Sequence, residues 1–510
     1  MQVGKFYLQT GKLREERMFK RILIVNRGEI AVRIIRTCRE MGIETITLYD
    51  ESDMDSLHVR LADVSVRLPS PETFLDVTTI VQIALAYQVD AVHPGYGFLA
   101  ESAPFAEALT EVGITFVGPT AEVITAVRAK VEVLAAVRKA GFPTVTNSPV
   151  CLGLENMAEI REMAEEIGYP LVIKSCWGGR GRGEQMVYKP EQLETAVQRA
   201  SAESRAVFDN ELIYLERALL PAHQIGVQLL GDQHGNLIHL GEREGSIIVG
   251  NQKIIEESPS PNLNEAQRRE ILQTALAIGT LFNYHNVGTV EFLLDGEGKF
   301  FFSEIKARIQ VEHSITEMLT GIDLVQQQIL IAAGEKLVWR QEDVPFSGWS
   351  MMCRLNAQDP WQNFLPSPGR LTAVRVPTGP QVRVDSYVYC GCRVPPEFDA
   401  LVAKVTTWGL DRETCLARMK GALADFVLMG TPTNLPLMQR IMHTTAFARA
   451  HYNTNFFTKP VANGETTAVE LRDMAVITAV HFARRHHMFN PTTPARWQSG
   501  WHQDSRRLPQ

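Results

Sequence analysis

EFLLDGEGKFFFSEIKARIQVEH, residues 291–313, contains two strongly apolar runs joined by a glycine-rich turn. The DGEGK segment is typical of a hairpin, so we expect the two runs to pair as antiparallel strands. Such pairing would bring Glu291 and Glu304 to one face of the hairpin. Two neighbouring carboxylates are able to hold Mg²⁺ against phosphate groups, so this face is a candidate metal site.

The end of the same stretch alternates polar and apolar residues. Arg308, Gln310 and Glu312 are two apart, which predicts a strand that presents all three side chains on one face. On that face they would form an anion site with a base beside it. The alternative is the solvated face of an edge strand, and the pattern leaves both interpretations open.

A second glycine-rich stretch, IKSCWGGRGRGE, lies at residues 173–184. Lys174 ends a predicted strand and four glycines follow it, so backbone N–H groups and one ammonium could approach phosphate oxygens. The spacing is not that of a Walker A motif, because there the lysine follows its glycines. A surface hairpin remains the alternative.

Near the N-terminus, predicted strands alternate with a helix. RILIV (21–25) and ETITLYD (44–50) predict strands, and the segment between them predicts a helix that ends near Gly42. This alternation predicts a parallel sheet. The turn VNRGEIA lacks the GxGxxG spacing of dinucleotide-binding folds, which disfavours hydride transfer.

These patterns predict a mixed chain, α/β in its first part and α+β in the rest. We expect an N-terminal extension at 1–17, a parallel α/β domain at 18–118, a helical linker at 119–145, a small α+β domain at 146–217, a large antiparallel-sheet domain at 218–460 and a helical, basic tail at 461–510.

The composition limits the classes of function. The 510 residues carry a net charge of −7, yet residues 1–21 hold six lysines and arginines against two glutamates, and residues 481–510 hold five arginines against one aspartate. The body is therefore acidic, which disfavours a nucleic-acid groove. No run of about 20 apolar residues predicts a membrane span. The N-terminus lacks a secretory signal, and seven cysteines without CxxC spacing are typical of a reducing compartment, so we expect a cytoplasmic protein.

Over about residues 18–460 the chain resembles biotin carboxylase, an ATP-grasp enzyme. The matching stretches are ILIVNRGEIAVRIIRTCREMGI, HPGYGFLAES, QKIIEESPSP, RIQVEHSITEMLTGIDLV, MMCRLNAQDP, FLPSPG and TPTN. The resemblance implies an ATP-grasp fold, in which an N-terminal α/β domain, a mobile lid and a large antiparallel-sheet domain follow one another. It also implies that ATP phosphorylates bicarbonate to carboxyphosphate and that the released CO₂ is captured by biotin.

The resemblance further assigns roles to individual positions. It implies nucleotide contacts at Lys130, Lys174, Gly179, Gly181, Glu216, Leu219 and Leu293, and metal ligands, for Mg²⁺ or Mn²⁺, at Glu291 and Glu304. It implies a bicarbonate site made of Lys253, Arg308, Gln310 and the backbone of Val311, with Glu312 as the base and Arg354 as the residue that stabilises the biotin enolate.

The sequence departs from the family mainly on the nucleotide side. Lys306 stands where the family has an asparagine metal ligand, and an ammonium cannot coordinate Mg²⁺. The other departures are Cys176, Trp177 and Arg180 in the lid loop, Ile248, Val249, Gly250 and Asn251 before the QK pair, and Gln224 in place of a histidine.

Two hypotheses follow. The first is a working biotin carboxylase, the first half-reaction of an acetyl-CoA carboxylase of the kind used in fatty acid biosynthesis. The second is a weakly active or inactive subunit that supports an active paralogue. The chain has no Ala-Met-Lys-Met pattern, so we expect biotin on a separate carrier protein, separate carboxyltransferase subunits, and a homodimer or a dimer with a paralogue. We also predict that the basic tail docks on an acidic surface.

Overall fold

The computed structural model describes residues 18–177, 184–208 and 210–457. The described residues form one compact unit. The predicted extension at 1–17 and the tail at 461–510 lie outside the described residues, so the docking of the tail stays a prediction. Among the helices described, none has the length and apolar character needed to cross a membrane.

The N-terminal part is a five-stranded parallel sheet, in the order β3-β2-β1-β4-β5. Its strands are β1 (Arg21–Ile24), β2 (Glu44–Tyr49), β3 (Val64–Arg67), β4 (Ala91–His93) and β5 (Thr115–Phe116). Its helices are α3 (Gly28–Glu40), α4 (Leu57–Leu61), α5 (Val77–Ala86) and α6 (Ala103–Glu111). Gly42 has a φ of +72° after the end of α3, a conformation that glycine adopts without steric cost. The predicted parallel α/β architecture is confirmed.

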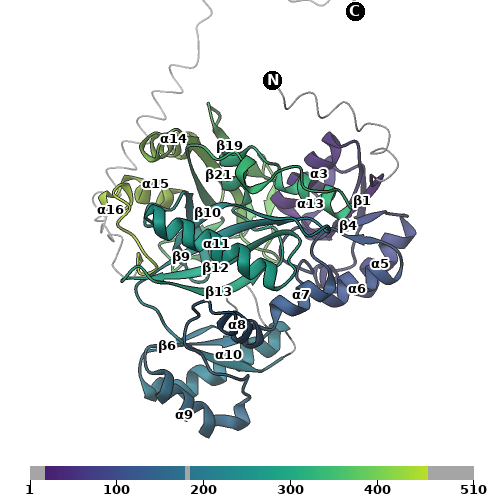
Figure 1. Ribbon diagram of the computed structural model, residues 1–510. Coiled ribbons are helices and arrows are strands. Elements are labelled where there is room, and N and C mark those ends of the chain that lie inside the picture. Colours follow the sequence, from purple (N-terminus) through teal and green to yellow (C-terminus); the bar gives the residue numbers. More distant parts are fainter. Residues whose placement is uncertain (1–17, 178–183, 209, 458–510) are drawn as a thin grey trace, which may run out of the picture. The chain divides into compact units, whose positions relative to one another are not determined.

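Two helices, α7 (Ala121–Arg128) and α8 (Lys130–Lys139), lead to a small unit that we call the lid unit (Figure 1). It contains a three-stranded antiparallel sheet in the order β7-β6-β8, with β6 (Leu171–Ser175), β7 (Gln185–Val187) and β8 (Ile213–Arg217). Helices α9 (Met157–Ile167) and α10 (Leu193–Phe208) share an apolar core with this sheet.

The rest of the body is built on an eight-stranded antiparallel sheet in the order β13-β12-β9-β10-β11-β14-β21-β19. The strands are β9 (Ala222–Gly231), β10 (Leu237–Val249), β11 (Gln252–Ser258), β12 (Asn286–Asp295), β13 (Phe300–Lys306), β14 (Trp349–Asn356), β19 (Val382–Ser386) and β21 (Leu401–Gly409). The predicted antiparallel domain is confirmed, while the domain boundaries remain predictions.

Helices and short strands complete this part of the chain. The helices are α11 (Glu265–Leu281), α12 (His313–Thr320), α13 (Leu324–Ala332), α14 (Arg412–Asp425), α15 (Leu435–His443) and α16 (Thr445–Ala448). The short strands pair as β15 (Gln358–Asp359) with β16 (Leu365–Pro366), β17 (Gly369–Arg370) with β20 (Arg393–Val394), and β18 (Ala373–Arg375) with β22 (Val427–Met429).

The segment that follows β13 corrects one prediction. The strand ends at Lys306, and residues 307–312 form an irregular segment that leads into α12. The predicted strand through Arg308, Gln310 and Glu312 is therefore wrong. Glu312 stands instead at the N-cap position of α12, with φ −79° and ψ 5°.

Candidate active site

The hairpin of β12 and β13 brings the two predicted carboxylates together. Glu291 lies directly opposite Glu304 in the strand register. The register shifts between Glu291 and Phe292, and this irregularity turns Glu304 away from the side of Phe302, two residues before it. Lys306, two residues after Glu304, lies on the same side, with its Nζ 2.7 Å from Glu304 Oε1.

A lysine on β11, which is separated from β12 by β9 and β10 in the sheet, joins this hairpin to the start of α12. Lys253 Nζ donates to both carboxylate oxygens of Glu291, at 2.9 and 3.0 Å, and lies 3.4 Å from Glu312 Oε1. Gln310 Nε2 donates to Glu291 Oε1 at 2.7 Å. Two of the predicted bicarbonate residues, the predicted base and one predicted metal ligand thus meet at one place, although residues 307–312 do not form a strand.

Arg354 on β14 closes the other side of this cluster. Its Nη2 donates to Glu312 Oε2 at 2.9 Å and to Glu256 Oε1 at 2.8 Å. Its Nε is buried and has no hydrogen-bond partner among the described residues. A buried guanidinium with an unused donor is suited to an incoming anion.

The charges of this cluster shift the pKa values of its carboxyl groups in opposite directions. Burial opposes ionisation of Glu312, yet Lys253 and Arg354 hold its pKa well below the usual range. Burial raises the pKa of Glu256 to about 7, and the charge of Glu312 acts in the same direction. Burial opposes the charge of Lys253, but Glu291 and Glu312 raise its pKa, so it stays an ammonium. Glu312 is therefore an ionised proton acceptor between two cations.

Two of the predicted bicarbonate residues make other contacts. Arg308 Nε donates to Glu101 Oε2 at 3.2 Å, and its Nη1 donates to the carbonyl oxygen of Ile309. Glu101 belongs to the HPGYGFLAES stretch, so the N-terminal domain contributes a carboxylate here. The carbonyl oxygen of Val311 accepts a hydrogen bond from the buried Lys404 Nζ at 3.0 Å.

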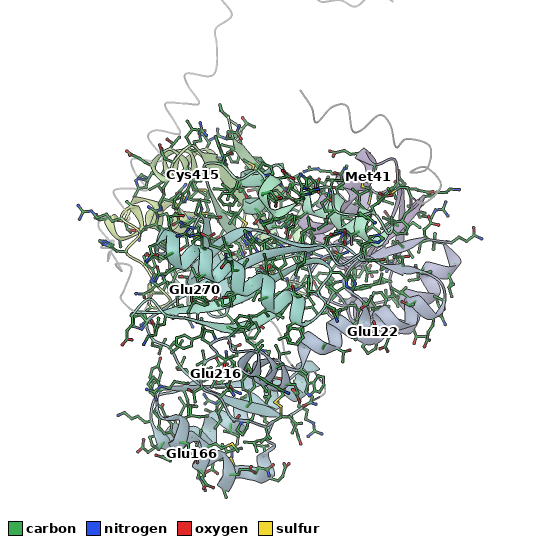
Figure 2. The ribbon with its side chains drawn as sticks, viewed as in Figure 1. Met41, Glu122, Glu166, Glu216, Glu270 and Cys415 are labelled. Carbon is green, nitrogen blue, oxygen red and sulfur yellow. A yellow bond between two sulfur atoms is a disulfide. The ribbon has the colours of Figure 1, made fainter. Side chains whose placement is uncertain are left out.

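The predicted nucleotide residues lie on the lid unit and on the hairpin. Lys174 Nζ donates to Glu216 Oε1 at 2.5 Å, across β6 and β8, and Figure 2 labels Glu216. Burial opposes the charge of Lys174, but Glu216 raises its pKa overall. Lys130 is the first residue of α8 and acts electrostatically on Glu304. Leu219 is half-buried just after β8.

The positions that we expect to depart from the family also fall in this region. Gln224 on β9 lies opposite Leu293 on β12. Ile248 lies opposite Lys253 across the β10–β11 hairpin, and the chain turns at Gly250, with φ +56°. The backbone oxygen of Trp177 accepts from Arg128 Nε at 3.2 Å. Gly179, Arg180 and Gly181 lie outside the described residues.

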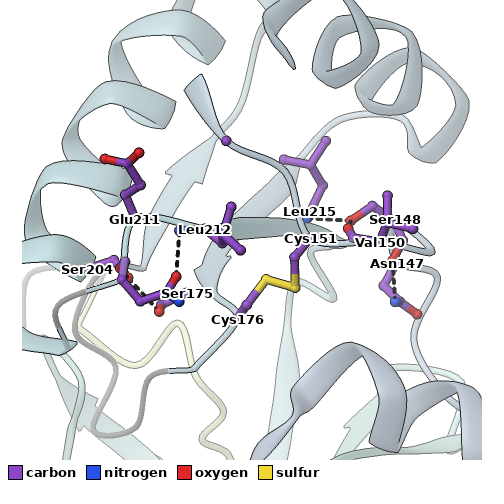
Figure 3. The surroundings of a disulfide bond; sticks show 12 residues. Asn147, Ser148, Val150, Cys151, Ser175, Cys176, Ser204, Glu211, Leu212 and Leu215 are labelled. Atoms are coloured by element: carbon purple, nitrogen blue, oxygen red, sulfur yellow. Dashed lines mark hydrogen bonds between the residues drawn. A yellow bond between two sulfur atoms is a disulfide. The ribbon is translucent and has the colours of Figure 1, made fainter. Parts of the chain in front are cut away.

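A disulfide joins Cys151 and Cys176, with their Cα atoms 6.2 Å apart (Figure 3). It links the segment before α9 to the residue that follows β6. The cysteine pattern did not predict it, because pairing cannot be deduced from spacings alone. The interpretation of the cysteines as reduced is corrected for these two, while the other five are free thiols.

Sequence reasoning missed two charged residues at the centre of the cluster. Arg243 on β10 donates to Gln310 Oε1 at 2.8 Å and to Gln228 Oε1 at 2.7 Å, and it thereby orients Gln310. Glu256 on β11 holds Arg354. A usable signal existed: GEREGS and IIEES place charges inside otherwise apolar strands, and buried charges are rare unless they are paired.

The residues at this hairpin fit the metal ion that the resemblance implies only in part. Two facing carboxylates suit one Mg²⁺ that keeps waters and phosphate oxygens as its other ligands. Lys306 does not suit it, since an ammonium offers no lone pair. Within the described residues there is no group of three or more His, Cys, Asp or Glu side chains that could hold a metal on its own.

Comparison with known proteins places the chain among relatives of one kind. The profile of the biotin carboxylase N-terminal domain matches residues 18–124, that of the ATP-binding domain of the carbamoyl-phosphate synthase L chain matches 129–340, and that of the biotin carboxylase C-terminal domain matches 352–459. Biotin carboxylase 1 of Bacillus subtilis is 44% identical over 443 residues, which are 86% of this chain and 98% of the relative.

Two solved structures are similar to that of this chain. One is the biotin carboxylase domain dimer of the Hydrogenobacter thermophilus 2-oxoglutarate carboxylase, in complex with MgADP, ADP and bicarbonate, with a TM-score of 0.84 and 39% identity over 87% of this chain and 98% of that chain. The other is a biotin carboxylase–β,γ-ATP complex from Campylobacter jejuni, with a TM-score of 0.83 and 37% identity over 87% of this chain and 100% of that chain.

Proposed function

Since this chain belongs to the biotin carboxylase family, we propose that it carboxylates biotin with bicarbonate in an ATP-dependent reaction. The observation that carries this proposal is the cluster of Lys253, Glu312 and Arg354, in which Glu312 is buried and the two cations are largely so. It combines an ionised proton acceptor with two fixed cations, which a reaction between an anion and a neutral ureido group requires.

Each side chain of the cluster has a role that its position supports. Lys253 and Gln310 can turn their N–H groups from Glu291 to a bicarbonate oxygen, with Arg308 and the Val311 backbone completing the site. Glu312 accepts the bicarbonate proton. A bound anion competes for Lys253 and so weakens the interaction that lowers the pKa of Glu312. Arg354 stabilises negative charge that develops on the ureido oxygen of biotin.

The nucleotide would lie between the lid unit and the β12–β13 hairpin. Lys130 and Lys174 supply cations for its phosphates, Gly179 and Gly181 supply backbone N–H groups, and Glu216, Leu219 and Leu293 contact the adenosine side. One Mg²⁺ or Mn²⁺ ion, held by Glu291 and Glu304, would neutralise phosphate charge when it is bound.

For the partners, we propose a biotin carrier protein and carboxyltransferase subunits on separate chains. The support is that the match covers 98% of the Bacillus subtilis biotin carboxylase and 100% of the Campylobacter jejuni one. We propose a dimer, either with itself or with a paralogue, because the Hydrogenobacter thermophilus domain is a dimer.

We also propose a cytoplasmic location and acetyl-CoA as the final acceptor. The disulfide does not support that location, since disulfides are rare in the cytosol.

The test is release of ADP by the purified protein with ATP, Mg²⁺ or Mn²⁺, free biotin and bicarbonate. We expect release to require both biotin and bicarbonate. Glu312→Gln should lower the rate by about 10²-fold or more, because general bases contribute about that much. Glu342→Gln, at an exposed glutamate, is the matched control and should leave the rate unchanged. Absence of ADP release, together with no thermal shift on addition of ATP, would contradict catalysis and favour a supporting subunit.

A further inference from the structure

The cation at residue 306 lies where the facing carboxylates would meet phosphate. Lys306 Nζ is 2.7 Å from Glu304 Oε1, and the side chains of the two residues are 11% and 28% exposed. Glu291 lies directly across from Glu304, so Lys306 belongs to the same face as both candidate metal ligands.

The neighbouring cations divide into paired and unpaired ones. Lys174 is bound to Glu216, and Lys253 is bound to Glu291. Lys130 forms no ion pair within the described part of the chain, but its charge, like those of Lys306 and Lys174, acts on Glu304. Three ammonium groups thus act on Glu304, and of these Lys130 and Lys306 have N–H donors that a phosphate can accept from.

An ammonium resembles a divalent cation in one respect and differs in another. It cannot accept a lone pair from oxygen as Mg²⁺ does, but it has three N–H donors. Lys306 can therefore keep one donor on Glu304 and turn the others to phosphate oxygens. In this way Lys306 links the Glu304 carboxylate to the phosphate, as a bound metal ion would.

We propose that Lys306 replaces one divalent cation at the phosphate site, so that this chain binds nucleotide with little dependence on Mg²⁺. The inference rests on the proposed function, because it assumes that ATP and ADP bind at this hairpin. On this inference Lys306 neutralises part of the phosphate charge. The lysine that stands in place of asparagine therefore contributes to nucleotide binding.

The test is the affinity for ADP, measured by calorimetry in EDTA and in excess Mg²⁺. For the native protein we expect the two affinities to agree within about threefold. For Lys306→Asn we expect affinity in EDTA to fall about tenfold or more, as charge-assisted hydrogen bonds to phosphate are lost, and to recover with Mg²⁺. Lys306→Arg keeps the charge and should behave like the native protein.

Lys299→Asn is the matched control, since Lys299 is an exposed lysine at the turn of the same hairpin and pairs with Glu297 at 3.0 Å. It should change neither affinity. If native protein and Lys306→Asn need Mg²⁺ to the same extent, the inference is wrong while the proposed function stands. If the native protein binds no ADP under either condition, the proposed function fails as well. Thermal unfolding of each variant shows whether it is folded.

Discussion

At the scale of single residues, Glu256 is a member of the cluster that the sequence did not predict. Arg354 donates to Glu256 and to Glu312 through one nitrogen, so two carboxylates share one guanidinium. Burial raises the pKa of Glu256 to about 7. A carboxyl group whose folded pKa is raised stabilises the protein fully below its unfolded pKa, and that stabilisation is lost as the pH rises through about 7.

As the pH rises from about 6.5 to 8.5, we therefore expect ionisation of Glu256 to lower the free energy of unfolding by about 1 kcal/mol. Glu256→Gln should remove this loss. Burial lowers the pKa values of His58, His93 and His313, so these titrate below the window. Urea unfolding at both pH values measures the effect, with Glu270→Gln, exposed on α11 and labelled in Figure 2, as the control. An unchanged pH dependence in Glu256→Gln would show that Glu256 is ionised throughout.

Residue identities in the cluster were predictable where a family motif contains them. Lys253, Gln310, Glu312 and Arg354 were all named from such stretches, and the structure brings them together. Their partners were not predictable in the same way, because which carboxylate Arg354 contacts depends on the pairing of β11 with β14. That pairing joins residues about a hundred positions apart, beyond the reach of local patterns.

At the scale of elements, the β12–β13 hairpin shows what strand patterns leave out. The turn and the pairing were predictable from DGEGK and two apolar runs. The register shift beside Phe292 was not, although it decides that Glu304 faces Glu291. The end of β13 at Lys306 was also missed, because the alternation of polar and apolar residues continues through Glu312 while the strand does not.

The disulfide of the lid unit gives a prediction about β6 and its surroundings. Cys151 and Cys176 are 25 residues apart, and a cross-link of that span stabilises by roughly 3 kcal/mol. We expect dithiothreitol to speed amide exchange in α9 and β6 while leaving β1 and β2 of the N-terminal sheet unchanged. Hydrogen exchange followed by mass spectrometry measures this. Cys151→Ala/Cys176→Ala should exchange like the reduced protein with or without the reductant. If reduction changes nothing in α9 and β6, the bond does not stabilise the lid unit.

At the scale of the whole body, buried charges join the N-terminal domain to the large sheet. Helix α3 contacts β19 and β21. Its Glu29 lies 3.0 Å from Lys404 Nζ, and both side chains are almost fully buried. Burial raises the pKa of Glu29 to about 7 even with Lys404 beside it. The two parts could be predicted separately, from a parallel and an antiparallel pattern. The contact between them could not, since nothing in either pattern marks Glu29 or Lys404 as partners.

This pair gives a prediction about the stability of the whole body. Lys404→Met leaves Glu29 buried without its cation, and removing one partner of a buried ion pair costs about 3–5 kcal/mol. The loss should be largest near pH 8.5 and smaller near pH 6, where Glu29 is protonated, because its raised pKa means that stability is lost as the pH rises. Glu29→Met/Lys404→Met removes both charges and should recover most of the stability. Urea unfolding of the two variants at both pH values distinguishes the cases. If Lys404→Met is as stable as the native protein at pH 8.5, Lys404 does not stabilise the body. If the double variant recovers no stability, Lys404 acts through its hydrogen bond to Val311. In either case the charge of Glu29 does not join α3 to the sheet.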